Sequence, residues 1–475
     1  MSRDSVLDSA ARLRRTLPED FGDGVVTSIF DDAARIARAS VTTPVADGAA
    51  RRPAFDQVLD RALTHRVWGF VVMGALFYAV FWFTIAGAAV PSDLLYVLLV
   101  DHGHTWLRAG FEVVGSPWWV TGLLVDGVYL GTAWVVAVML PPMAIFFPLF
   151  TLLEDFGYLP RVAFNLDRLF AGAGAHGKQS LTMMMGYGCN AAGVTATRII
   201  DSPRERLIAI ITNNFSVCNG RWPTLILMGT IFIGSLAPPA LAGVLAAGSV
   251  VLVAVLGILT TLAVSWVLSR TVLRGETSVY SLELPPYRPP QVWRTIYTSM
   301  IDRTYKVLRR ALVMAAPAGA VIWLLGNLHL GGTTLAAHLV TGLEPVGWVL
   351  GLNGIILLAY LVAIPANEIV IPTILMLTLT LGHTPGAPAA DAAAGVMVNL
   401  SDTQAGTVLI DIGGWTLLTA VNLMLFCLLH NPCSTTMLTI WRETHSLKWT
   451  TLATLLPLGL AGLVCALVAL AWRTF

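Results

Sequence analysis

Charged residues are scarce in this chain of 475 residues. Only 12% of the residues are Asp, Glu, Lys or Arg, whereas 56% are hydrophobic. A soluble globular chain has about twice that charged fraction, so the composition argues against a soluble enzyme and against a disordered chain. The 29 basic residues are balanced by 28 acidic ones. Because no charge excess is left to attract a polyanion, nucleic acid is not expected as a partner.

Cysteines are few, and the motifs of secretion and nucleotide binding are missing. The five cysteines all lie in apolar stretches, which excludes the disulfide framework of a small secreted protein. The first 66 residues contain no apolar core of a signal peptide. Residues 172–179 nearly match the phosphate-loop pattern G-x-x-x-x-G-K-[ST], but Gln179 occupies the position of the magnesium-binding hydroxyl. We therefore expect a chain that hydrolyses no nucleotide and is not an enzyme.

Long apolar segments make up most of the chain. About 20 apolar residues suffice to cross a bilayer, and shorter helices are tolerated there only where they line a cavity or are buried in protein. The pattern predicts an all-α polytopic membrane protein with about eight to ten spans or half-spans, some of them broken helices. The predicted segments are 69–90, 127–150, 181–199, 207–217, 222–236, 240–268, 311–328, 346–381, 415–429 and 450–472.

The positions of Lys and Arg predict the orientation. Ten arginines lie in residues 1–66 and eight basic residues lie in 269–310, whereas residues 311–440 contain none. Basic segments stay on the cytoplasmic side of a membrane, so we expect a multi-pass protein of the cell (inner) membrane with a cytoplasmic N-terminus. The segments expected on the external side are 91–126, 329–345 and 382–412.

Four regions follow from these patterns. Residues 1–66 are expected to form a cytosolic stalk, with amphipathic helical spacing at 26–37 and 55–63 and a linker at 41–53. The stalk is either a solvated region or a docking site for a soluble partner. The remaining regions are a first membrane half at 67–270, a cytoplasmic Pro-rich linker at 271–307 and a second membrane half at 308–475.

Polar groups interrupt four of the apolar segments. Each interruption combines a helix-breaking Gly or Pro with a thiol, an amide or a carboxylate, and such groups are costly to bury in a membrane unless they have a function. A broken helix also places free backbone carbonyls and a helix-dipole end inside the membrane. The residues at these breaks are Cys189 and Asn190, Cys218 and Asn219, Asn367 and Glu368, and His430 and Cys433.

These side chains predict a path for a divalent metal ion. Thiols with a carboxylate and amides suit a borderline-soft metal, whereas a sodium or potassium site needs no thiol. Glu368 has no Lys or Arg near it in the sequence, which favours metal or proton binding. A neutral, hydrogen-bonded His430 is as good an interpretation as a ligand. The predicted metal residues are Cys189, Asn190, Cys218, Asn219, Asn367, Glu368, His430 and Cys433, while Cys427 and Cys465 are interpreted as apolar filler.

Five motifs of the chain resemble those of one known family. They are LTHR at 63–66, LEDFGYLPRVAF at 153–164, GYGCN at 186–190, ELPPYR at 283–288 and LLHNPC at 428–433. The second resembles a Leu-Glu-Asp-x-Gly-Tyr-x-x-Arg-x-Ala-Phe run, and the third resembles Gly-Phe-Gly-Cys-Asn, of the FeoB-type ferrous-iron transporters. Because the motifs follow that family's order across residues 55–450, the chain resembles the membrane, or Gate-domain, portion of such a transporter.

The resemblance implies Fe(II) as the transported substrate and no permanently bound cofactor. Members of the family usually begin with a GTPase domain, and Met1 lies near what resembles the stalk after that domain. We therefore expect either a separate GTPase partner at the stalk or a transporter that works without one, and a homo-oligomer is a further open alternative. The family's Cys-Asn-Val-Pro reads CNAA at 189–192, and its Ala-Lys-Glu reads ANE at 366–368. These departures keep manganese, cobalt and zinc as alternatives to iron.

The order of the polar breaks repeats between the two halves. Each half begins with a span and continues with a segment that contains a polar break. A broken span and then a closing span complete the half. With the predicted orientation the halves run in opposite senses, so we expect an inverted repeat with the site at its interface.

Three other functions compete with metal import. A secondary carrier of nucleosides or other small organic solutes is the first, because broken-helix repeats also serve such substrates. A membrane scaffold is disfavoured by the cost of four polar breaks, and a membrane enzyme is disfavoured because no oriented base and nucleophile are visible.

Overall fold

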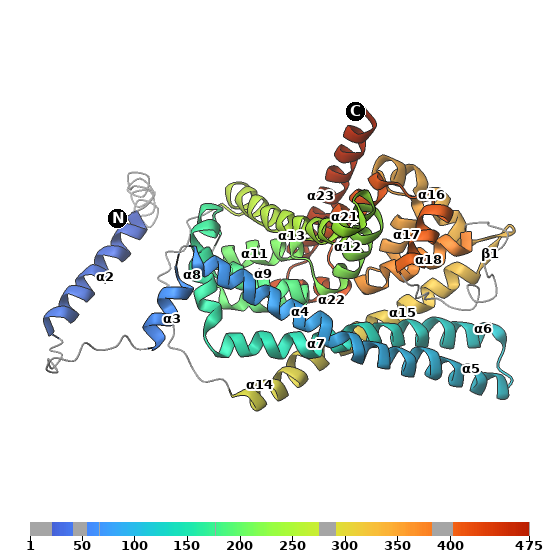
Figure 1. Cartoon of the computed structure of the whole chain (residues 1–475), viewed down its shortest axis with the longest axis horizontal. Helices are drawn as coiled ribbons and strands as arrows, with labels where there is room; N and C mark the ends of the chain where they lie inside the picture. Colours follow the sequence, from blue (N-terminus) through green and yellow to red (C-terminus); the bar gives the residue numbers. More distant parts are fainter. Residues whose placement is uncertain are drawn as a thin grey trace, which may run out of the picture.

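The protein is an assembly of helices (Figure 1). The computed structural model describes residues 21–40, 55–65, 67–175, 177–274, 291–381 and 402–474. Within these ranges the strands are limited to one small antiparallel hairpin, His329–Leu330 (β1) with Thr333–Thr334 (β2). The predicted all-α class is therefore confirmed.

Six helices of the described residues are long and apolar enough to cross a membrane, or seven if one bent pair is counted as a span. The bent pair is α16 (Leu335–Val349) with α17 (Gly354–Val362), at an angle of 110°. The count is lower than the predicted eight to ten because several broken helices are too short to pass as spans. The multi-pass class is confirmed. The six long helices are Trp68–Val113, Trp118–Asp155, Leu241–Arg270, Val292–Asn327, Leu417–Thr444 and Leu447–Thr474.

The first two long helices form a hairpin, and most of the segment 91–126 is helical within it. Helix α4 (Trp68–Tyr96) continues through η1 (Val97–Gly103) into α5 (His104–Val113). The returning helix consists of α6 (Trp118–Thr121), η2 (Gly122–Tyr129) and α7 (Leu130–Asp155), which contains Pro141, Pro142 and Pro148. A helix of 46 residues is about 69 Å long, more than twice the roughly 30 Å of a bilayer core. The far end of this hairpin is visible at α5 and α6 (Figure 1).

Ion pairs between the two long helices of this hairpin account for a charged residue that is buried there. Asp126 on η2 is 6% exposed and lies 2.7 Å from Nε2 of His104 on α5. Arg108, one turn further along α5, donates to both carboxylate oxygens of Asp126 at 3.2 Å. These contacts cross-link the two arms, whereas the sequence showed only a polar interruption.

Short helices make up the rest of the first half. The polar breaks fall between them where the sequence predicted. In chain order they are α8 (Tyr158–Gly172), α9 (Gln179–Gly188), α10 (Asn190–Ala196), η3 (Thr197–Ile199), α11 (Pro203–Thr212), η4 (Asn213–Phe215), η5 (Asn219–Arg221), α12 (Trp222–Met228), η6 (Gly229–Ile233), η7 (Gly234–Leu236) and the long α13 (Pro239–Arg270).

The second half follows the same plan. The expected external segment 329–345 contains the strand hairpin and most of α16, and residues 382–401 lie outside the described residues. The remaining helices are α14 (Val292–Ser299), η8 (Met300–Tyr305), α15 (Lys306–Asn327), η9 (Asn367–Ile369), α18 (Val370–Leu381), α20 (Asp402–Thr407), η10 (Val408–Ile412), α21 (Leu417–Leu429), α22 (Ser434–Thr444) and α23 (Leu447–Thr474).

Both predicted stalk helices are present as α2 (Phe21–Ser40) and α3 (Phe55–Leu63). The linker at 41–53 and the ELPPYR motif at 283–288 lie outside the described residues.

Small residues let the two membrane halves approach closely. Gly127 and Gly131, four residues apart on η2 and α7, face Gly319 on α15, and a Cβ added at Gly131 would lie 3.1 Å from the Gly319 Cα. Helices in lipid associate through such close contacts, because lipid offers no hydrophobic driving force between them. We infer that a larger side chain here would push α15 away from the first half.

The backbone at the breaks repeats between the halves. Cys189 has φ −154° and ψ 120°, and Ala366 has φ −153° and ψ 117°. Cys218 has φ −75° and ψ 165°, and Cys433 has φ −64° and ψ 159°. This correspondence is what a structural repeat requires, and the opposite sense of the two halves stays a prediction.

Candidate functional site

Seven of the eight predicted metal residues line one small cavity. They come from all four breaks, which lie as far apart as residues 189 and 433 in the sequence. The cavity has a volume of about 40 Å³, which is room for an ion or a water molecule. The seven residues are Cys189, Asn190, Cys218, Asn219, Asn367, Glu368 and Cys433.

Four helices that start at this cavity have no capping side-chain hydrogen bond. Away from the cavity, Ser202, Asn353 and Thr416 cap their helices with a side-chain oxygen that accepts a backbone N–H. At the cavity, the N-cap residues of α10, η5, η9 and α22 make no such bond. Three of these N-cap residues are cysteines, and the fourth is followed by Glu368 in the first turn.

Glu368 lies directly against the backbone of Gly220. A Cβ added at Gly220 would overlap the Glu368 carboxylate, so a larger residue here would displace the carboxylate from this position. Within the described ranges the Glu368 carboxylate takes part in none of the salt bridges, as its sequence context predicted. An acidic group without a cationic partner is available to a metal ion or a proton.

Asparagines hold the first two breaks together. Asn213 donates from Nδ2 to the carbonyl of Asn190 at 2.9 Å. The Asn190 amide nitrogen donates to the carbonyls of Gly186 and Ser216, at 3.0 and 3.2 Å, in the orientation that satisfies both of its ends. These bonds satisfy backbone carbonyls that the helix breaks leave open, and they leave Asn190 at the wall of the cavity.

Arg221 connects the first half to the second. Its side chain is 1% exposed, and its guanidinium donates to the carbonyls of Asn214 (2.8 Å), Leu428 (3.1 Å) and His430 (3.2 Å). Asn214 also donates to the His430 carbonyl at 2.7 Å. The last carbonyls of a helix carry a partial negative charge, so Arg221 stabilises the C-terminal end of α21 and fixes the fourth break.

His430 is the one predicted metal residue that does not line the cavity. It is 3% exposed, and its Nδ1 lies 2.9 Å from the Cys427 carbonyl. Its Nε2 lies 3.3 Å from Oδ1 of Asn367, and the Nδ2 of the same amide donates to the Cys218 sulfur at 3.9 Å. The hydrogen-bonded alternative for His430 therefore matches its position, since it stands behind Asn367 and orients it. Cys427 and Cys465 are buried away from the cavity, as expected for apolar filler.

The cavity is not a finished metal site. Among the described residues there is no group of three or more His, Cys, Asp or Glu side chains placed to hold a metal ion. An ion that passes through a protein must leave again, so its ligands must bind it weakly or in turn. The arrangement fits a transit position lined by mixed sulfur and oxygen donors better than a closed structural site.

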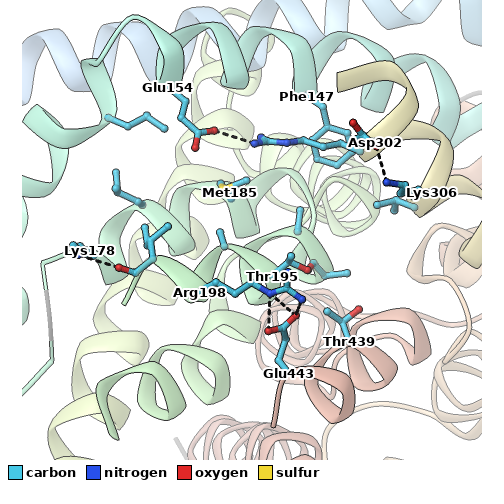
Figure 2. Close-up of a pocket in the computed structure, with 18 of the residues that line it drawn as sticks. Phe147, Glu154, Lys178, Met185, Thr195, Arg198, Asp302, Lys306, Thr439 and Glu443 are labelled. Carbon is cyan, nitrogen blue, oxygen red and sulfur yellow. Dashed lines mark hydrogen bonds and ion pairs between the residues drawn. The ribbon is translucent and has the colours of Figure 1, made fainter. Parts of the chain in front are cut away.

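A larger vestibule adjoins the cavity at Val307, which lines both. The vestibule has a volume of about 820 Å³, and Figure 2 shows charged side chains on several of its walls. These charged residues are Glu154, Lys178, Arg198, Asp302, Arg303, Lys306, Arg310, Arg442 and Glu443.

Glu443 links the two membrane halves at this vestibule. Its carboxylate accepts from Arg198 at 2.7 Å (Figure 2). It also accepts from Arg206 at 2.7 Å, and both arginines belong to the first half. The hydrogen bond and the negative charge of Glu443 raise the pKa of Arg198, so the arginine keeps its charge at any physiological pH. The contact joins the α10–α11 region to the end of α22, and α22 begins at Cys433 of the cavity.

The sequence analysis missed some residues of the site. Arg221 stood next to a break, and its charge inside an apolar region was a signal that it is held by buried carbonyls. Met139 and Met143 of α7 also line the cavity, but methionines four residues apart in an apolar helix are ordinary packing, and no sequence signal marked them.

Comparisons with known proteins agree with this architecture. A family described as "Nucleoside recognition" (Gate) matches residues 136–232 and 308–447, and one described as "Ferrous iron transport protein B C terminus" matches residues 250–303. Together the two matches cover more than half of the chain. No solved structure matches it.

Several curated proteins are similar to the chain. A "Fe(2+) transporter FeoB" of Staphylococcus aureus (strain MSSA476) is 29% identical over 419 residues, which are 85% of this chain and 57% of that protein. One of Synechocystis sp. (strain ATCC 27184 / PCC 6803 / Kazusa) is 27% identical over 96% of this chain and 70% of that protein. A Porphyromonas gingivalis "Fe(2+) transport protein A/Fe(2+) transporter FeoB fusion protein" is 30% identical over 56% of this chain and 30% of that protein.

Fold and cavity define a multi-pass membrane protein whose broken helices converge on a polar cavity. The matched families and relatives make the class more specific. The chain belongs to the FeoB-type family and corresponds to the membrane portion of its members, and it spans 57% of the length of the first S. aureus relative.

Proposed function

We propose that the chain transports a divalent metal ion across a membrane through the cavity at the four helix breaks, and that Fe(II) is its main substrate. The observation that carries this proposal is the convergence of three thiols, three amides and one unpaired carboxylate on a single cavity of about 40 Å³. Relatives named as Fe(2+) transporters support iron as the ion.

In this mechanism the ion passes between donors that different helices supply. Glu368 provides the charged oxygen ligand, Cys189, Cys218 and Cys433 provide sulfur, and the amides of Asn190, Asn219 and Asn367 provide neutral oxygens. Fe(II) is borderline in softness and accepts this mixture. A thiol or a carboxyl group binds the ion as the anion, so the ion displaces protons as it binds.

The size of the cavity weighs against a nucleoside carrier. Sites for organic ligands usually measure about 300–1,000 Å³, and the central cavity holds about 40 Å³. The vestibule is large enough for an organic solute, but the four breaks and their thiols do not line it. The description "Nucleoside recognition" of one matched family therefore gives the weaker hypothesis.

Metal uptake into proteoliposomes tests the proposal. The purified chain should take up Fe(II) under reducing conditions, and Mn(II), Co(II) and Zn(II) should compete in an order that reports the ligand set. Labelled nucleosides serve as the matched alternative substrate. Uptake of nucleoside without uptake of metal would reverse the assignment.

A soluble partner at the stalk completes the proposal. GTPase domains precede this region in members of the family, so a GTPase is the first candidate for regulation at α2 and α3. The P. gingivalis relative is named as a fusion with Fe(2+) transport protein A, which adds a second candidate partner. Uptake measured with and without a candidate GTPase and GTP tests this part separately.

A further inference from the structure

A groove with a purely basic set of charged residues lies between the start of α15 and α22. It has a volume of about 550 Å³, and its lining includes Lys306, Arg309, Arg310 and Arg442 but no acidic residue. Lys306 is paired with Asp302 at 2.6 Å. The three arginines form no ion pair with any acidic residue of the described ranges. Three arginines without an ion pair in the described ranges therefore line this groove.

The other walls of the groove are apolar and face outward. Ile301, Tyr305 and Val313 line it and are 43%, 60% and 64% exposed. The apolar surface continues along α15 through Val321 and Leu324, which are 46% and 41% exposed. On a membrane protein, exposed aliphatic side chains of a spanning helix face lipid tails. The basic end of this surface lies where the helix leaves the apolar segment, at the level expected for lipid headgroups.

We propose that this groove binds one anionic phospholipid, with its phosphate between Arg309, Arg310 and Arg442 and its acyl chains along α15. Arginine binds phosphate with two parallel hydrogen bonds, and basic pockets between membrane helices bind anionic headgroups. The Tyr305 hydroxyl can donate a further hydrogen bond at the headgroup level, where tyrosine is enriched in membrane proteins. A neutral phospholipid lacks the net charge that three unpaired guanidinium groups require.

The groove shares a wall with the transport path. Thr435 lines both the groove and the central cavity, while Arg310 and Arg442 line both the groove and the vestibule. An ion in the path is therefore close to the arginines, and its repulsion from them falls when a phosphate neutralises them. Anionic lipid should raise the rate of metal uptake. This consequence rests on the proposed function, whereas the lipid site itself does not.

Native mass spectrometry of the full chain in detergent tests the site. We titrate dioleoyl-phosphatidylglycerol against dioleoyl-phosphatidylcholine and expect at least about tenfold preference for the anionic lipid, which the triple variant Arg309→Gln/Arg310→Gln/Arg442→Gln should lose. The matched control removes three exposed cations outside the groove, Arg270→Gln/Arg294→Gln/Lys448→Gln, and should keep the preference. Equal preference in wild type and triple variant, or equal loss in the control, would overturn the proposal.

A charge-preserving variant and a competition with inorganic phosphate serve as further controls for the lipid preference. The charge-preserving variant Arg309→Lys/Arg310→Lys/Arg442→Lys should keep most of the preference even if the glutamine variant folds poorly. Loss of the preference in a folded lysine variant contradicts an electrostatic site.

Inorganic phosphate at millimolar concentration should not displace the lipid, because it lacks the acyl chains. Displacement would assign the groove to a soluble anion. Fe(II) uptake in vesicles with and without phosphatidylglycerol then tests the consequence, and its failure leaves lipid binding untouched.

Discussion

Asp60 and Arg161, 101 residues apart in the sequence, form an ion pair at 3.0 Å between the stalk helix α3 and α8. Arg161 is 1% exposed and also donates to the Gly157 carbonyl at 2.7 Å. One turn further along α8, Asn165 donates to the Leu63 carbonyl at the end of α3. The stalk is thereby attached to the helix whose first turn, at Leu159, lines the vestibule.

Loss of the Asp60 carboxylate should destabilise the attachment of the stalk. Asp60→Asn leaves the buried Arg161 guanidinium without its charged partner, which we expect to cost about 1–3 kcal/mol because Asp60 is partly exposed. Thermal unfolding in detergent measures the loss. The matched control is Asp32→Asn, which breaks the exposed pair with Arg35 in α2 and should change nothing measurable. An unchanged unfolding temperature for Asp60→Asn would mean that α3 is not held by this pair.

Removal of residues 1–50 should leave the membrane fold intact. The truncated chain keeps α3, and therefore keeps the contact between Asp60 and Arg161, while it loses α2. We expect normal membrane insertion and thermal stability, together with loss of any response of uptake to a soluble GTPase. A truncated chain that still responds to the partner would show that α2 is not part of the docking surface.

Glu368→Gln should reduce metal uptake by about tenfold or more, because a neutral amide replaces a charged ligand in a cavity without another carboxylate. Protons and metal compete for the same oxygens, so wild-type uptake should fall as pH falls, and the variant should lose most of this dependence. Initial Fe(II) uptake across a pH series measures both effects. Glu368→Asp should keep part of the activity, and Glu112→Gln, a change at an exposed helix position, should behave as wild type. Equal rates and pH profiles in wild type and Glu368→Gln would assign Glu368 a structural role.

Serine at the three cavity cysteines should change metal preference more than rate. A hydroxyl still offers oxygen to Fe(II), but it binds thiophilic ions poorly. The variant Cys189→Ser/Cys218→Ser/Cys433→Ser should therefore keep part of its Fe(II) uptake and lose most of the inhibition by Cd(II). The matched control, Cys427→Ser/Cys465→Ser, changes thiols outside the cavity and should keep the inhibition. If both variants keep it, sulfur takes no part in the path.

Alanine at Gly220 should disturb the position of Glu368. The added Cβ would overlap the Glu368 carboxylate, so the carboxylate must shift away from Gly220. We expect Fe(II) uptake to fall as in Glu368→Gln, with a smaller loss of stability. The matched control is Gly248→Ala in α13, where an added Cβ has nothing within 4 Å. Wild-type uptake by Gly220→Ala would place the Glu368 carboxylate elsewhere during transport.

The comparison of sequence and structure is clearest at the four breaks. A Gly or Pro next to a thiol, amide or carboxylate inside an apolar segment is a local pattern, and seven of the eight residues that it predicted line one cavity. The hairpin at 91–126 shows the opposite case. Its residues were expected on the external side of the membrane, but the contact between Arg108 and the buried Asp126, which joins two long helices, could not be read from the sequence.

The sequence by itself determined the class of protein and the kind of chemistry, because hydropathy, helix breakers and ligand-type side chains act locally along the chain. Tertiary structure alone decided that Glu368 stands against Gly220, that Arg221 binds carbonyls of the other half, and that His430 lies behind Asn367 rather than in the cavity. Those relationships join residues that are 63 to more than 200 positions apart. Their geometry depends on how helices from two halves pack, and a linear pattern carries no information about that packing.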